Sequence, residues 1–584
     1  MTAQTGFFVL RVPLLPLDIL SGWAAAPALQ HSVSPSELQP PLIAHVAHLR
    51  ASYRALLANP IVREAIFVAS PDLDGAIDTW LRDPDLPRSR DVERALTRYL
   101  TRMASRPTPF GLFSSVAAGQ AGAETTLAVA PHTAIHRHTR LDIDYLNQVV
   151  EALTGDPAIR AWLRYRPVDT ACRIGGSWRY IETRVKDKVR THHLVSIEDN
   201  SAVRVALRRA ASGATAAELA AAVRAAGVDD AEDFASALID SRILQPDLEC
   251  PVTGDRPVDA LVRRLSSIPG AEPLVTALSR ADAALRAIDA GPLAAGSHAY
   301  RAIADTLTAL PAKVELARLF QVDASRPAGA TLGPEALALL RRGGELLLEL
   351  YPREGDDEEL GQVKRAWGER FEGREVPLLE ALDAEAGIGS ELGSGARGSS
   401  ALLEGLVFPD TTTPTAAWAE RDACLLSLIV RAASAGRLEV ELGDAELKVL
   451  RPKTPRPAPP AFAVNATLVG GPGQPLQVLV QGTTGVPTAR LAGRFCHLDP
   501  ELDAGVRRVI AAEEALEPDA VHAEIVHLPE GRAGNVILRP VLREYEITED
   551  GLRVLPDSLS QYDGLLTGRP QERARPISDG VKLS

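Results

Sequence analysis

The chain of 584 residues is too long for one hydrophobic core, and its apolar and charged fractions, 46% and 24%, are those of an ordinary globular protein. The net charge of −13 excludes nucleic-acid binding through an overall basic surface, so any such contact must rest on a local patch. Four widely spaced cysteines, with no Cys-x-x-Cys pair, argue against a disulfide scaffold or a structural zinc site.

The N-terminal stretch is apolar but short. Residues 6–13 are interrupted by Arg11 and Pro13, which indicates a first β-strand and not a signal peptide. No apolar run approaches the length of a membrane span, so no integral membrane segment is expected. Together with the sparse cysteines, this predicts a cytoplasmic protein.

Helices are predicted over the next hundred residues. Apolar residues recur at helical spacing over 40–69 and again, more briefly, over 72–80. A helix over 91–102 carries an apolar stripe and, beside it, a row of arginines at every fourth residue: Arg90, Arg94, Arg98, Arg102 and Arg106. Such a row could meet phosphates, or it could be a solvated face balanced by Asp91 and Glu93. The helix alone leaves both interpretations open.

The helix should stop at a Pro-Thr-Pro break. Pro107 disfavours helical backbone at Arg106, and Pro109 does the same at Thr108, so both residues are expected in extended backbone. Gly111 can then turn tightly. The segment could simply end a helix and begin a strand, but its density of special residues favours a functional loop.

A change of pattern marks residues 168–253. Alternating strands at 177–185 and 191–198, joined by a turn at 186–188, precede three helices and a closing strand. The first helix is predicted at 201–211 and the third at 231–241. The second begins at Thr215, where Thr215 and Glu218 form a capping box, and the closing strand is predicted at 243–248. This order is typical of a small winged-helix module, which could bind nucleic acid or be purely structural.

The second half begins with helices and ends with strands. Residues 258–310 are predicted to be mostly helical, and 333–350 to form an amphipathic helix whose core positions are Leu337, Leu340, Leu347 and Leu348. An extended Pro-rich connector follows at 452–460. Strands are then predicted at 463–469, 476–482, 521–527 and 535–538.

Several catalytic motifs are missing from the sequence. It contains no Gly-x-x-x-x-Gly-Lys-Ser/Thr phosphate loop, no His-Glu-x-x-His zinc helix and no Gly-x-Ser-x-Gly nucleophile elbow. Histidines gather at His132, His136 and His138 and at 192–193, and polar loops explain both groups better than a metal site does.

The motif around the break resembles the signature of a known family. Arg102-Met-Ala-Ser-Arg106-Pro-Thr108-Pro-Phe-Gly111-Leu-Phe113 is similar to the signature of the lantibiotic dehydratases, the LanB-type enzymes. Further blocks resemble the same family in the same order: Arg140-Leu-Asp142, Phe320-Gln-Val-Asp323, residues 371–380 followed by Gly387-Ile-Gly, Gly493-Arg494-Phe495, and residues 528–540. The resemblance is to the N-terminal, glutamyl-tRNA-dependent transfer domain. It implies an α+β fold of several subdomains, with mixed and antiparallel sheets, helical segments and an inserted winged-helix-like module.

The resemblance implies a chemistry. Lantibiotic dehydratases take glutamate from glutamyl-tRNA, esterify it to Ser or Thr of a ribosomal precursor peptide, and eliminate it to leave a dehydroamino acid. Glutamyl-tRNA would be a co-substrate, and no cofactor would be bound. Carried over position by position, the aminoacyl-transfer site would contain Arg102, Arg106, Thr108, Asp142 (or its neighbour Asp144), Asp323 and Arg494.

Roles follow from the chemistry of these groups. The tRNA or its aminoacyl group would be anchored by Arg94, Arg98, Arg102 and Arg106, because guanidinium groups pair with phosphates and carboxylates. Thr108 would hydrogen-bond the reacting ester. Asp142 or Asp323 could orient the arginines or act as the base, and the sequence leaves that choice open.

The resemblance also implies four segments. Residues 1–165 would begin the transfer domain, and 166–255 would form the winged-helix module that captures the leader of the precursor peptide as an added strand. Residues 256–451 would be the mostly helical part of the transfer domain, and 452–584 its β-rich part. Relatives continue through more of the transfer domain and an elimination domain. We therefore expect a separate elimination partner. The missing end of the transfer domain indicates a truncated product or completion by another chain.

Three functions are open at this point. The chain could be the transfer part of a split dehydratase that acts in lanthipeptide- or thiopeptide-type biosynthesis. It could be a peptide aminoacyl-tRNA ligase of the same family, which joins an amino acid to a peptide C-terminus by an amide bond. It could also be a non-catalytic scaffold that docks the leader peptide. Expected partners are tRNA, the precursor peptide, an elimination protein and other biosynthetic enzymes, with a homodimer also open.

Overall fold

The described residues of the α+β chain fall into two compact units. The computed structural model describes residues 5–24, 35–168, 170–186, 189–350, 359–374, 376, 378–383, 387–389, 418–452, 459–470, 474–526, 534–548 and 551–554. One unit combines the residues before 334 with those after 487, and the other holds those between. These boundaries fall inside the predicted segments 256–451 and 452–584.

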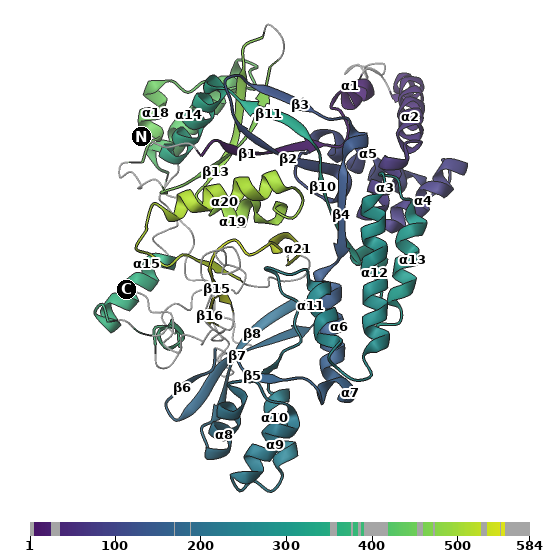
Figure 1. Ribbon diagram of the computed structural model, residues 1–584. Coiled ribbons are helices and arrows are strands. Elements are labelled where there is room, and N and C mark those ends of the chain that lie inside the picture. Colours follow the sequence, from purple (N-terminus) through teal and green to yellow (C-terminus); the bar gives the residue numbers. More distant parts are fainter. Residues whose placement is uncertain are drawn as a thin grey trace. The chain divides into compact units, whose positions relative to one another are not determined.

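The first unit is built on a six-stranded mixed sheet (Figure 1). Its strands are β1 (Phe7–Pro13), β2 (Ser114–Ala121), β3 (Thr126–Val129), β4 (His136–Leu141), β10 (Phe320–Ser325) and β11 (Ala328–Leu332). The order is β3-β11-β2-β10-β4, with β1 antiparallel to β2, and only β10 and β11 run parallel to β2. The predicted N-terminal strand is therefore confirmed.

The pairing of β10 with β4 sorts their side chains onto two faces. Asp323 lies opposite His138 in this antiparallel pair. Because side chains alternate along a strand, Asp323 and His138 share one face with Arg140, while Val322 and Arg137 point to the other. We call the face of Asp323 the open face and that of Val322 the closed face.

The closed face is covered by N-terminal helices. They are α1 (Asp18–Ala24), α2 (Pro35–Leu57), α3 (Pro60–Ala69), α4 (Pro71–Arg82) and α5 (Ser89–Ser105). The helical stretch predicted at 40–69 forms two helices, because Pro60 occupies the first turn of α3 and the Asn59 side chain accepts from the Ile61 amide. Val322 and Ala324 of the sheet pack into the same core as Ile66.

Further helices continue from the sheet. They are α6 (Ile143–Gly155), α7 (Pro157–Arg160), α11 (Pro257–Leu265), α12 (Glu272–Ala290) and α13 (Ser297–Leu307), with three short 3-10 turns, η1 (Gly111–Phe113), η2 (His132–Ala134) and η3 (Leu316–Arg318). Helices α12 and α13 lie side by side (Figure 1), and α12 contacts β4. The predicted helical character of 258–310 is confirmed.

The elements of the predicted module are present. They are β5 (Tyr165–Pro167), β6 (Cys172–Ile174), β7 (Ser177–Lys186), β8 (Val189–Glu198), α8 (Ser201–Ala210), α9 (Ala216–Ala225), α10 (Ala231–Asp240) and β9 (Leu244–Pro246). The capping box between Thr215 and Glu218 is formed as predicted. Strands β6-β7-β8 make one sheet, whereas β9 pairs with β5 outside it. Asp187 and Lys188 of the predicted turn lie outside the described residues.

The C-terminal part of the first unit covers the open face. Its elements are α19 (Thr488–Ala492), η4 (Gly493–Phe495), α20 (Pro500–Glu514), β14 (Ala523–Ile525), α21 (Gly534–Ile537), β15 (Tyr545–Thr548) and β16 (Gly551–Val554). The strand predicted at 535–538 is wrong, because this stretch forms the short helix α21, which is held by long-range hydrogen bonds of Asn535. Residues 527–533 and 555–584 lie outside the described residues.

The described residues of the second unit form helices and one hairpin. Its elements are α14 (Pro334–Leu350), α15 (Glu359–Phe371), α16 (Leu378–Ala381), α17 (Glu420–Ser434), α18 (Asp444–Leu450), β12 (Ala463–Val469) and β13 (Gln477–Thr484). The predicted hairpin strands are confirmed. The expected leucine core of α14 is wrong at Leu347, which is 37% exposed. Helix α14 packs closely against the hairpin at Gly343. A side chain there would not fit, since its Cβ would lie 2.5 Å from Cγ2 of Val480.

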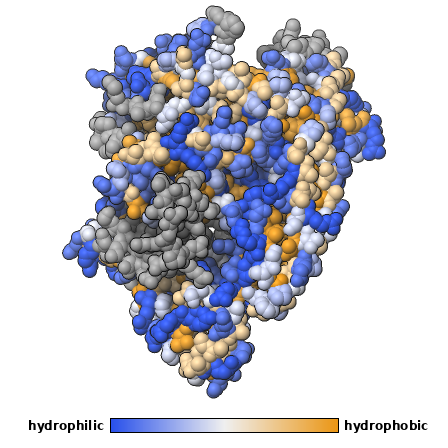
Figure 2. Space-filling view, viewed as in Figure 1, coloured by the Kyte–Doolittle hydropathy of each residue, from blue (hydrophilic) through white to orange (hydrophobic). Residues whose placement is uncertain are grey.

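The surface agrees with the ordinary composition. The face in Figure 2 is largely hydrophilic, with apolar residues in smaller groups. No helix in the described part of the chain is both long and apolar enough to cross a membrane.

Candidate functional site

The signature motif forms the helix stop that the sequence predicts. Helix α5 ends at Ser105, and Arg106 follows in extended backbone with φ −112° and ψ 111°. Gly111 has φ +54°, a value that favours glycine, and opens the turn η1. The Leu15 amide donates to the carbonyl of Met103 over 3.0 Å, so the end of α5 is attached to the chain just beyond β1.

The arginine row on α5 is mostly exposed. Arg90, Arg94, Arg98, Arg106 and Thr108 are exposed to solvent. Arg94 pairs with Asp91 over 3.2 Å, both side chains being more than 70% exposed. Arg102 is the exception, since its guanidinium group lies 4.3 Å from the centre of the Phe110 ring and its buried Nε has no partner among the described residues.

A second cluster lies on the open face of the sheet. Asp323 on β10 accepts from Nη1 of Arg140 at 2.9 Å and from Nη2 of Arg494 at 2.7 Å. The Asp323 side chain is only 2% exposed. Burial opposes its ionisation, but the Arg140 and Arg494 guanidinium groups outweigh burial and lower the pKa of Asp323. The carboxylate is therefore charged and shared between two cations.

Asp142 joins this cluster through Asn535. Asp142 is the N-cap of α6, and its Oδ1 accepts from the Asp144 amide and from Asn535 Nδ2, each at 2.9 Å. The Asn535 carbonyl accepts from Arg140 Nη2 at 2.8 Å. Asp142 is fully buried, whereas Asp144 is half-buried and its carboxylate accepts from Gln148 on α6. Of the two neighbouring aspartates, Asp142 is the one connected to Arg140.

Two histidines border the cluster. His138 Nε2 lies 3.1 Å from Oγ of Ser325, and His497 Nε2 lies 3.0 Å from Nη1 of Arg140. The two rings are nearly perpendicular, with centroids 6.4 Å apart. The polar loop predicted for His136 and His138 is wrong, because both lie on β4.

The strand predicted at 191–198 is confirmed as β8, so the polar-loop interpretation of His192 and His193 is wrong. His136 and His138 share one face of β4, whereas the consecutive His192 and His193 point to opposite faces of β8.

The cluster has an excess of positive charge. Burial lowers the pKa of both histidines, and Arg140 lowers them further, so both rings are neutral near pH 7. Arg11 on β1 faces the same side as Val116, and burial together with the Arg494 cation lowers its pKa. Such a site can hold an anion and donate hydrogen bonds to a developing negative charge. No group of three His, Cys, Asp or Glu side chains in the described ranges is arranged to bind a metal ion.

The structure gathers only some of the residues predicted from the sequence. Asp142, Asp323 and Arg494 meet in one hydrogen-bonded network. Arg102, Arg106 and Thr108 lie at the end of α5, and no hydrogen bond or ion pair between described residues joins them to that network. The sequence did not single out four participants, Arg140, His138, His497 and Asn535. The alternation of His136-Arg137-His138-Thr139-Arg140 was the available signal for two of them.

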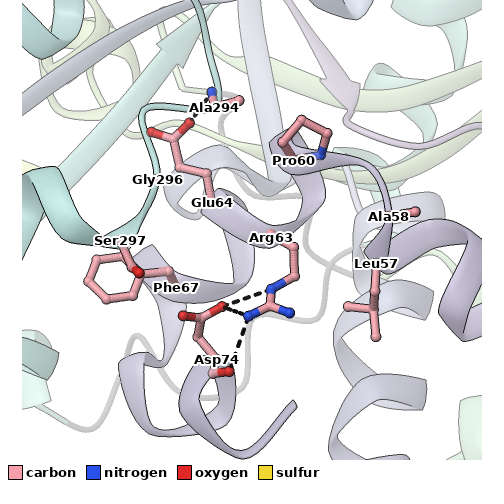
Figure 3. A pocket seen from close by; sticks show the side chains of 10 residues that line it. All are labelled: Leu57, Ala58, Pro60, Arg63, Glu64, Phe67, Asp74, Ala294, Gly296 and Ser297. Carbon is pink, nitrogen blue, oxygen red and sulfur yellow. Dashed lines mark hydrogen bonds and ion pairs between the residues drawn. The ribbon is translucent and has the colours of Figure 1, made fainter. Parts of the chain in front are cut away.

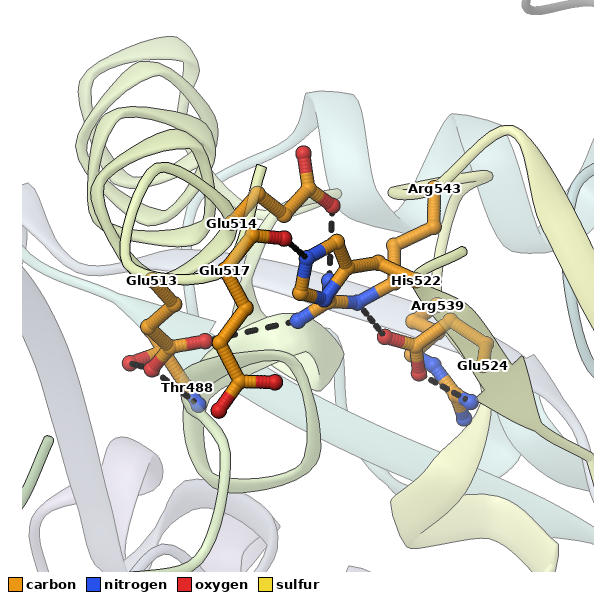
Figure 4. Close-up of polar contacts among 8 residues, drawn as sticks. All are labelled: Thr488, Glu513, Glu514, Glu517, His522, Glu524, Arg539 and Arg543. Atoms are coloured by element: carbon orange, nitrogen blue, oxygen red, sulfur yellow. Dashed lines mark hydrogen bonds and ion pairs between the residues drawn. The ribbon is translucent and has the colours of Figure 1, made fainter. Parts of the chain in front are cut away.

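The segment that carries Asn535 is held by a second set of ion pairs, drawn in Figure 4. Glu524 accepts from Arg539 at 2.8 Å and from Arg543 at 3.0 Å, and Arg543 also reaches Glu513 and Glu514 on α20. The Arg539 amide and carbonyl pair with the backbone of Val252 and Gly254, where the chain leaves the module. These contacts fix the backbone on both sides of the cluster.

A pocket of about 300 Å³ lies elsewhere in this unit, beside α3 (Figure 3). Arg63 on its wall is paired with Asp74 and Asp78. Glu64 accepts from Tyr300 at 2.8 Å and from the Ala294 amide. Arg63 and Glu64 of this pocket are thus already paired, unlike Nε of Arg494 on the open face.

Comparison with known families and sequences points in one direction. The model of a family described as "Lantibiotic dehydratase, N terminus" matches residues 58–560. The chain is 25% identical over 348 residues to the subtilin biosynthesis protein SpaB of Bacillus subtilis, covering 57% of this chain and 32% of that protein. It is 28% identical over 104 residues to the epidermin biosynthesis protein EpiB of Staphylococcus epidermidis, covering 18% of this chain and 10% of EpiB.

Solved structures share the fold. The tRNA-dependent lantibiotic dehydratase MibB from Microbispora sp. 107891 matches with a TM-score of 0.69 at 22% identity, over 93% of this chain and 50% of MibB. The TbtB glutamylation domain from thiomuracin biosynthesis matches with a TM-score of 0.52 at 18% identity, over 91% of this chain and 69% of that domain. The chain thus spans about a third of SpaB and half of MibB.

Proposed function

Because this chain belongs to the lantibiotic dehydratase family, in the part described as its N terminus, we propose that it transfers glutamate from glutamyl-tRNA to Ser or Thr side chains of a ribosomal precursor peptide. This is the first step of dehydroamino acid formation. The observation that carries the proposal is the cluster around Asp323, in which Arg494 keeps a buried Nε without a partner among the described residues. Arginine donors left unused inside a protein suit an anionic substrate.

The reaction is an ester exchange. The Ser or Thr hydroxyl oxygen attacks the carbonyl carbon of the aminoacyl ester, the carbonyl oxygen becomes an oxyanion, and the ribose oxygen leaves with a proton that balances the one lost by the hydroxyl. Bond energies nearly cancel, so the enzyme must orient two large substrates and stabilise the oxyanion. The carboxylate of Asp323 holds Arg140 and Arg494 in place for the second task.

Asp323 fits an orienting role better than that of the base. Both its oxygens already accept from arginines, and its pKa is lowered, so it is a weak proton acceptor. Asp142 is likewise engaged as a helix cap and as an acceptor from Asn535. These contacts support the view that both aspartates position cations.

The arginines of α5 would anchor the acceptor end of the tRNA. Arg94 and Arg98 are exposed on the helix and Arg106 is exposed just beyond its end, where phosphates can approach. Arg102 would support this surface through its stacking on Phe110, and Thr108 would hydrogen-bond the ester.

The module at 166–255 would bind the leader of the precursor peptide. Among the described strands β8 pairs only with β7, so its other side is an edge to which an extended peptide can add. Leu194 on this strand is 55% exposed. Elimination of the glutamyl group would then complete the dehydration.

One experiment tests the proposal. The purified protein is incubated with charged tRNA and precursor peptide, and the peptide mass is measured. A glutamyl adduct that mild base removes supports Ser/Thr esterification, a base-stable adduct indicates a peptide ligase, and no adduct favours a leader-binding scaffold. Precursor without its leader should give little adduct.

The residue assignment is tested by Arg106→Ala, which should abolish the adduct. The exposed Arg280→Ala on α12 serves as a control that should retain it. Adduct formation by Arg106→Ala at the wild-type rate would reject the anchoring role of the α5 arginines.

A further inference from the structure

His497 belongs to the open-face cluster, and its hydrogen bond fixes its tautomer. It follows Arg494 by three residues, just after the turn η4, and both side chains reach the cluster around Asp323. Its Nε2 lies 3.0 Å from Nη1 of Arg140, and arginine can only donate. Nε2 must therefore accept, and the ring proton sits on Nδ1.

The surroundings keep this ring neutral. Burial and the Arg140 guanidinium group lower the pKa of His497, and Arg494 acts in the same direction, while Asp323, 4.0 Å away, opposes them only partly. His138, which faces it, is also neutral, and His136 on the same strand points to the same side. A second proton on His497 would also displace the hydrogen bond from Arg140.

The Nδ1–H group has no acceptor among the described residues, although Nε2 has its donor. The His497 side chain is 31% exposed, against 2% for Asp323. The free donor thus lies at the accessible edge of a cluster whose deeper members are hydrogen-bonded to each other. A neutral N–H held in this way can donate to an oxygen that gains negative charge, without giving up its proton.

We propose that His497 is a catalytic residue that donates a hydrogen bond from Nδ1 to the carbonyl oxygen of the aminoacyl ester as that oxygen becomes an oxyanion. This inference rests on the proposed transfer function. No proton is transferred in the step: the ring keeps Nδ1–H, Arg140 keeps its hydrogen bond to Nε2, and the only bonds made and broken are those of the ester exchange.

A purely structural role for His497 can be separated from this one by two amides. In His497→Asn the side-chain NH₂ takes the place of Nδ1–H, so the donor is kept and the acceptor for Arg140 is lost. In His497→Gln the longer side chain places its amide oxygen near the position of Nε2, so the acceptor is kept and the donor is lost.

The test is the rate of glutamyl adduct formation with saturating glutamyl-tRNA. We expect kcat to fall about 100-fold in His497→Gln and His497→Ala, and less than about 10-fold in His497→Asn, with KM for the tRNA changed little in all three. Thermal unfolding of each variant shows that it is folded. The inference would be overturned if kcat stayed near wild type in His497→Gln and fell in His497→Asn, or if all three variants had wild-type rates. Either result would leave the transfer function standing.

Two further results complete the test. If wild-type protein forms no adduct at all, the transfer function fails and this inference fails with it.

The pH profile of kcat supplies an independent readout, because a ring that stays neutral cannot produce an acid limb. Wild type and His497→Asn should show the same profile between about pH 5.5 and 7.5. An acid limb present only in the wild type would assign His497 a proton-transfer role and overturn the inference.

Discussion

Two arginines three residues apart on strand β4 serve opposite faces of the same sheet. Arg137 points to the closed face, where it pairs with Glu64 and Asp289 and its side chain is 1% exposed. Arg140 points to the open face, where it meets Asp323 and His497. Both are arginine–carboxylate clusters, but only the closed one is fully paired.

The closed-face cluster uses its polar atoms completely. Glu64 accepts from Arg137, from the Tyr300 hydroxyl and from the Ala294 amide, and Asp289 accepts from the amide and hydroxyl of Thr139. Burial, and then the charge of Glu64, raise the pKa of Tyr300, so its hydroxyl remains a donor. In the open-face cluster, Nε of Arg494 and Nδ1 of His497 have no acceptor in the described part of the chain. Complete pairing stabilises a fold, whereas unused donors at an accessible edge can serve a substrate.

The largest expected effect is on stability, at the closed face. Glu64→Gln removes one of the two carboxylates that pair with buried Arg137 and turns an acceptor into an amide. We expect the free energy of unfolding to fall by about 3–5 kcal/mol, because a buried cation loses one of its two ion pairs. Chemical denaturation measures this. The exposed Asp91→Asn should change it by less than about 0.5 kcal/mol.

Adduct formation per folded molecule should be unchanged in Glu64→Gln. A clear loss of kcat per folded molecule in Glu64→Gln would show that the two faces are not functionally distinct.

The next effect is on activity, at the open face. Arg494→Met removes one cation from Asp323 but leaves Arg140 in place, so we expect kcat for transfer to fall about 10²–10³-fold with a much smaller loss of stability. Arg507→Met on α20, whose pair with Asp503 is half-exposed, is the matched control. Normal transfer by Arg494→Met would contradict the assignment of the open face.

The same variant predicts a pH effect on stability. Arg494 helps to lower the pKa of Asp323, and a carboxylate with a lowered folded-state pKa stabilises the protein above its unfolded pKa of about 4 and ceases to do so as pH falls through the folded value. Without Arg494 that folded value rises. The stability that the Asp323 charge contributes above about pH 4 should then be smaller than in the wild type, and its loss on acidification should end at a higher pH, as unfolding at a series of pH values would show.

Asn535→Asp should have a smaller effect on stability, and one that grows as pH rises instead of as pH falls. Its new carboxylate would face Asp142, 2.9 Å from the former Nδ2, while still accepting from the Ile143 amide. Two carboxyls at this distance share a proton, so their pKa rises above the unfolded value. The variant should be closest to wild type in acid and lose about 1–3 kcal/mol as pH rises through that raised pKa.

The control for this variant is Asn200→Asp. Asn200 caps α8 and only accepts, from the Val203 amide, so a carboxylate should serve equally well there. Equal effects of the two substitutions across the pH range would remove Asn535 from the open-face network.

Local chemistry explains what the sequence could predict. The end of α5 follows from Pro107, the capping box of α9 from Thr215 and Glu218, and the hairpin strands from their alternation. The open-face cluster is different, because Arg140 reaches partners that are 183, 357 and 395 residues away in the chain. No periodicity spans such distances. The resemblance assigned Asp142, Asp323 and Arg494 to the site, whereas Arg140 and Asn535, which stand in its matching blocks, were not assigned a role.

Helix α21 shows why one strand was predicted wrongly. The apolar run after Asn535 has the composition of a strand, but Asn535 is hydrogen-bonded to Asp142 and the Ile143 amide. Tertiary contacts of this kind override local preference over four residues. The same cause hid Asn535 as a site residue, because its partners lie on an element from the other end of the chain.

The smallest expected effect decides between the two interpretations of the α5 arginines. Arg94→Gln removes a side chain that is 72% exposed and paired only with Asp91, so stability should change by less than about 0.5 kcal/mol. If α5 meets phosphates, each lost contact reduces the slope of log Kd against log salt concentration by about 0.7–0.9. Binding of charged tRNA at several KCl concentrations measures that slope. Arg263→Gln on α11, 68% exposed, should leave it unchanged. Equal slopes for the two variants would mean that the arginine row of α5 is only a solvated face.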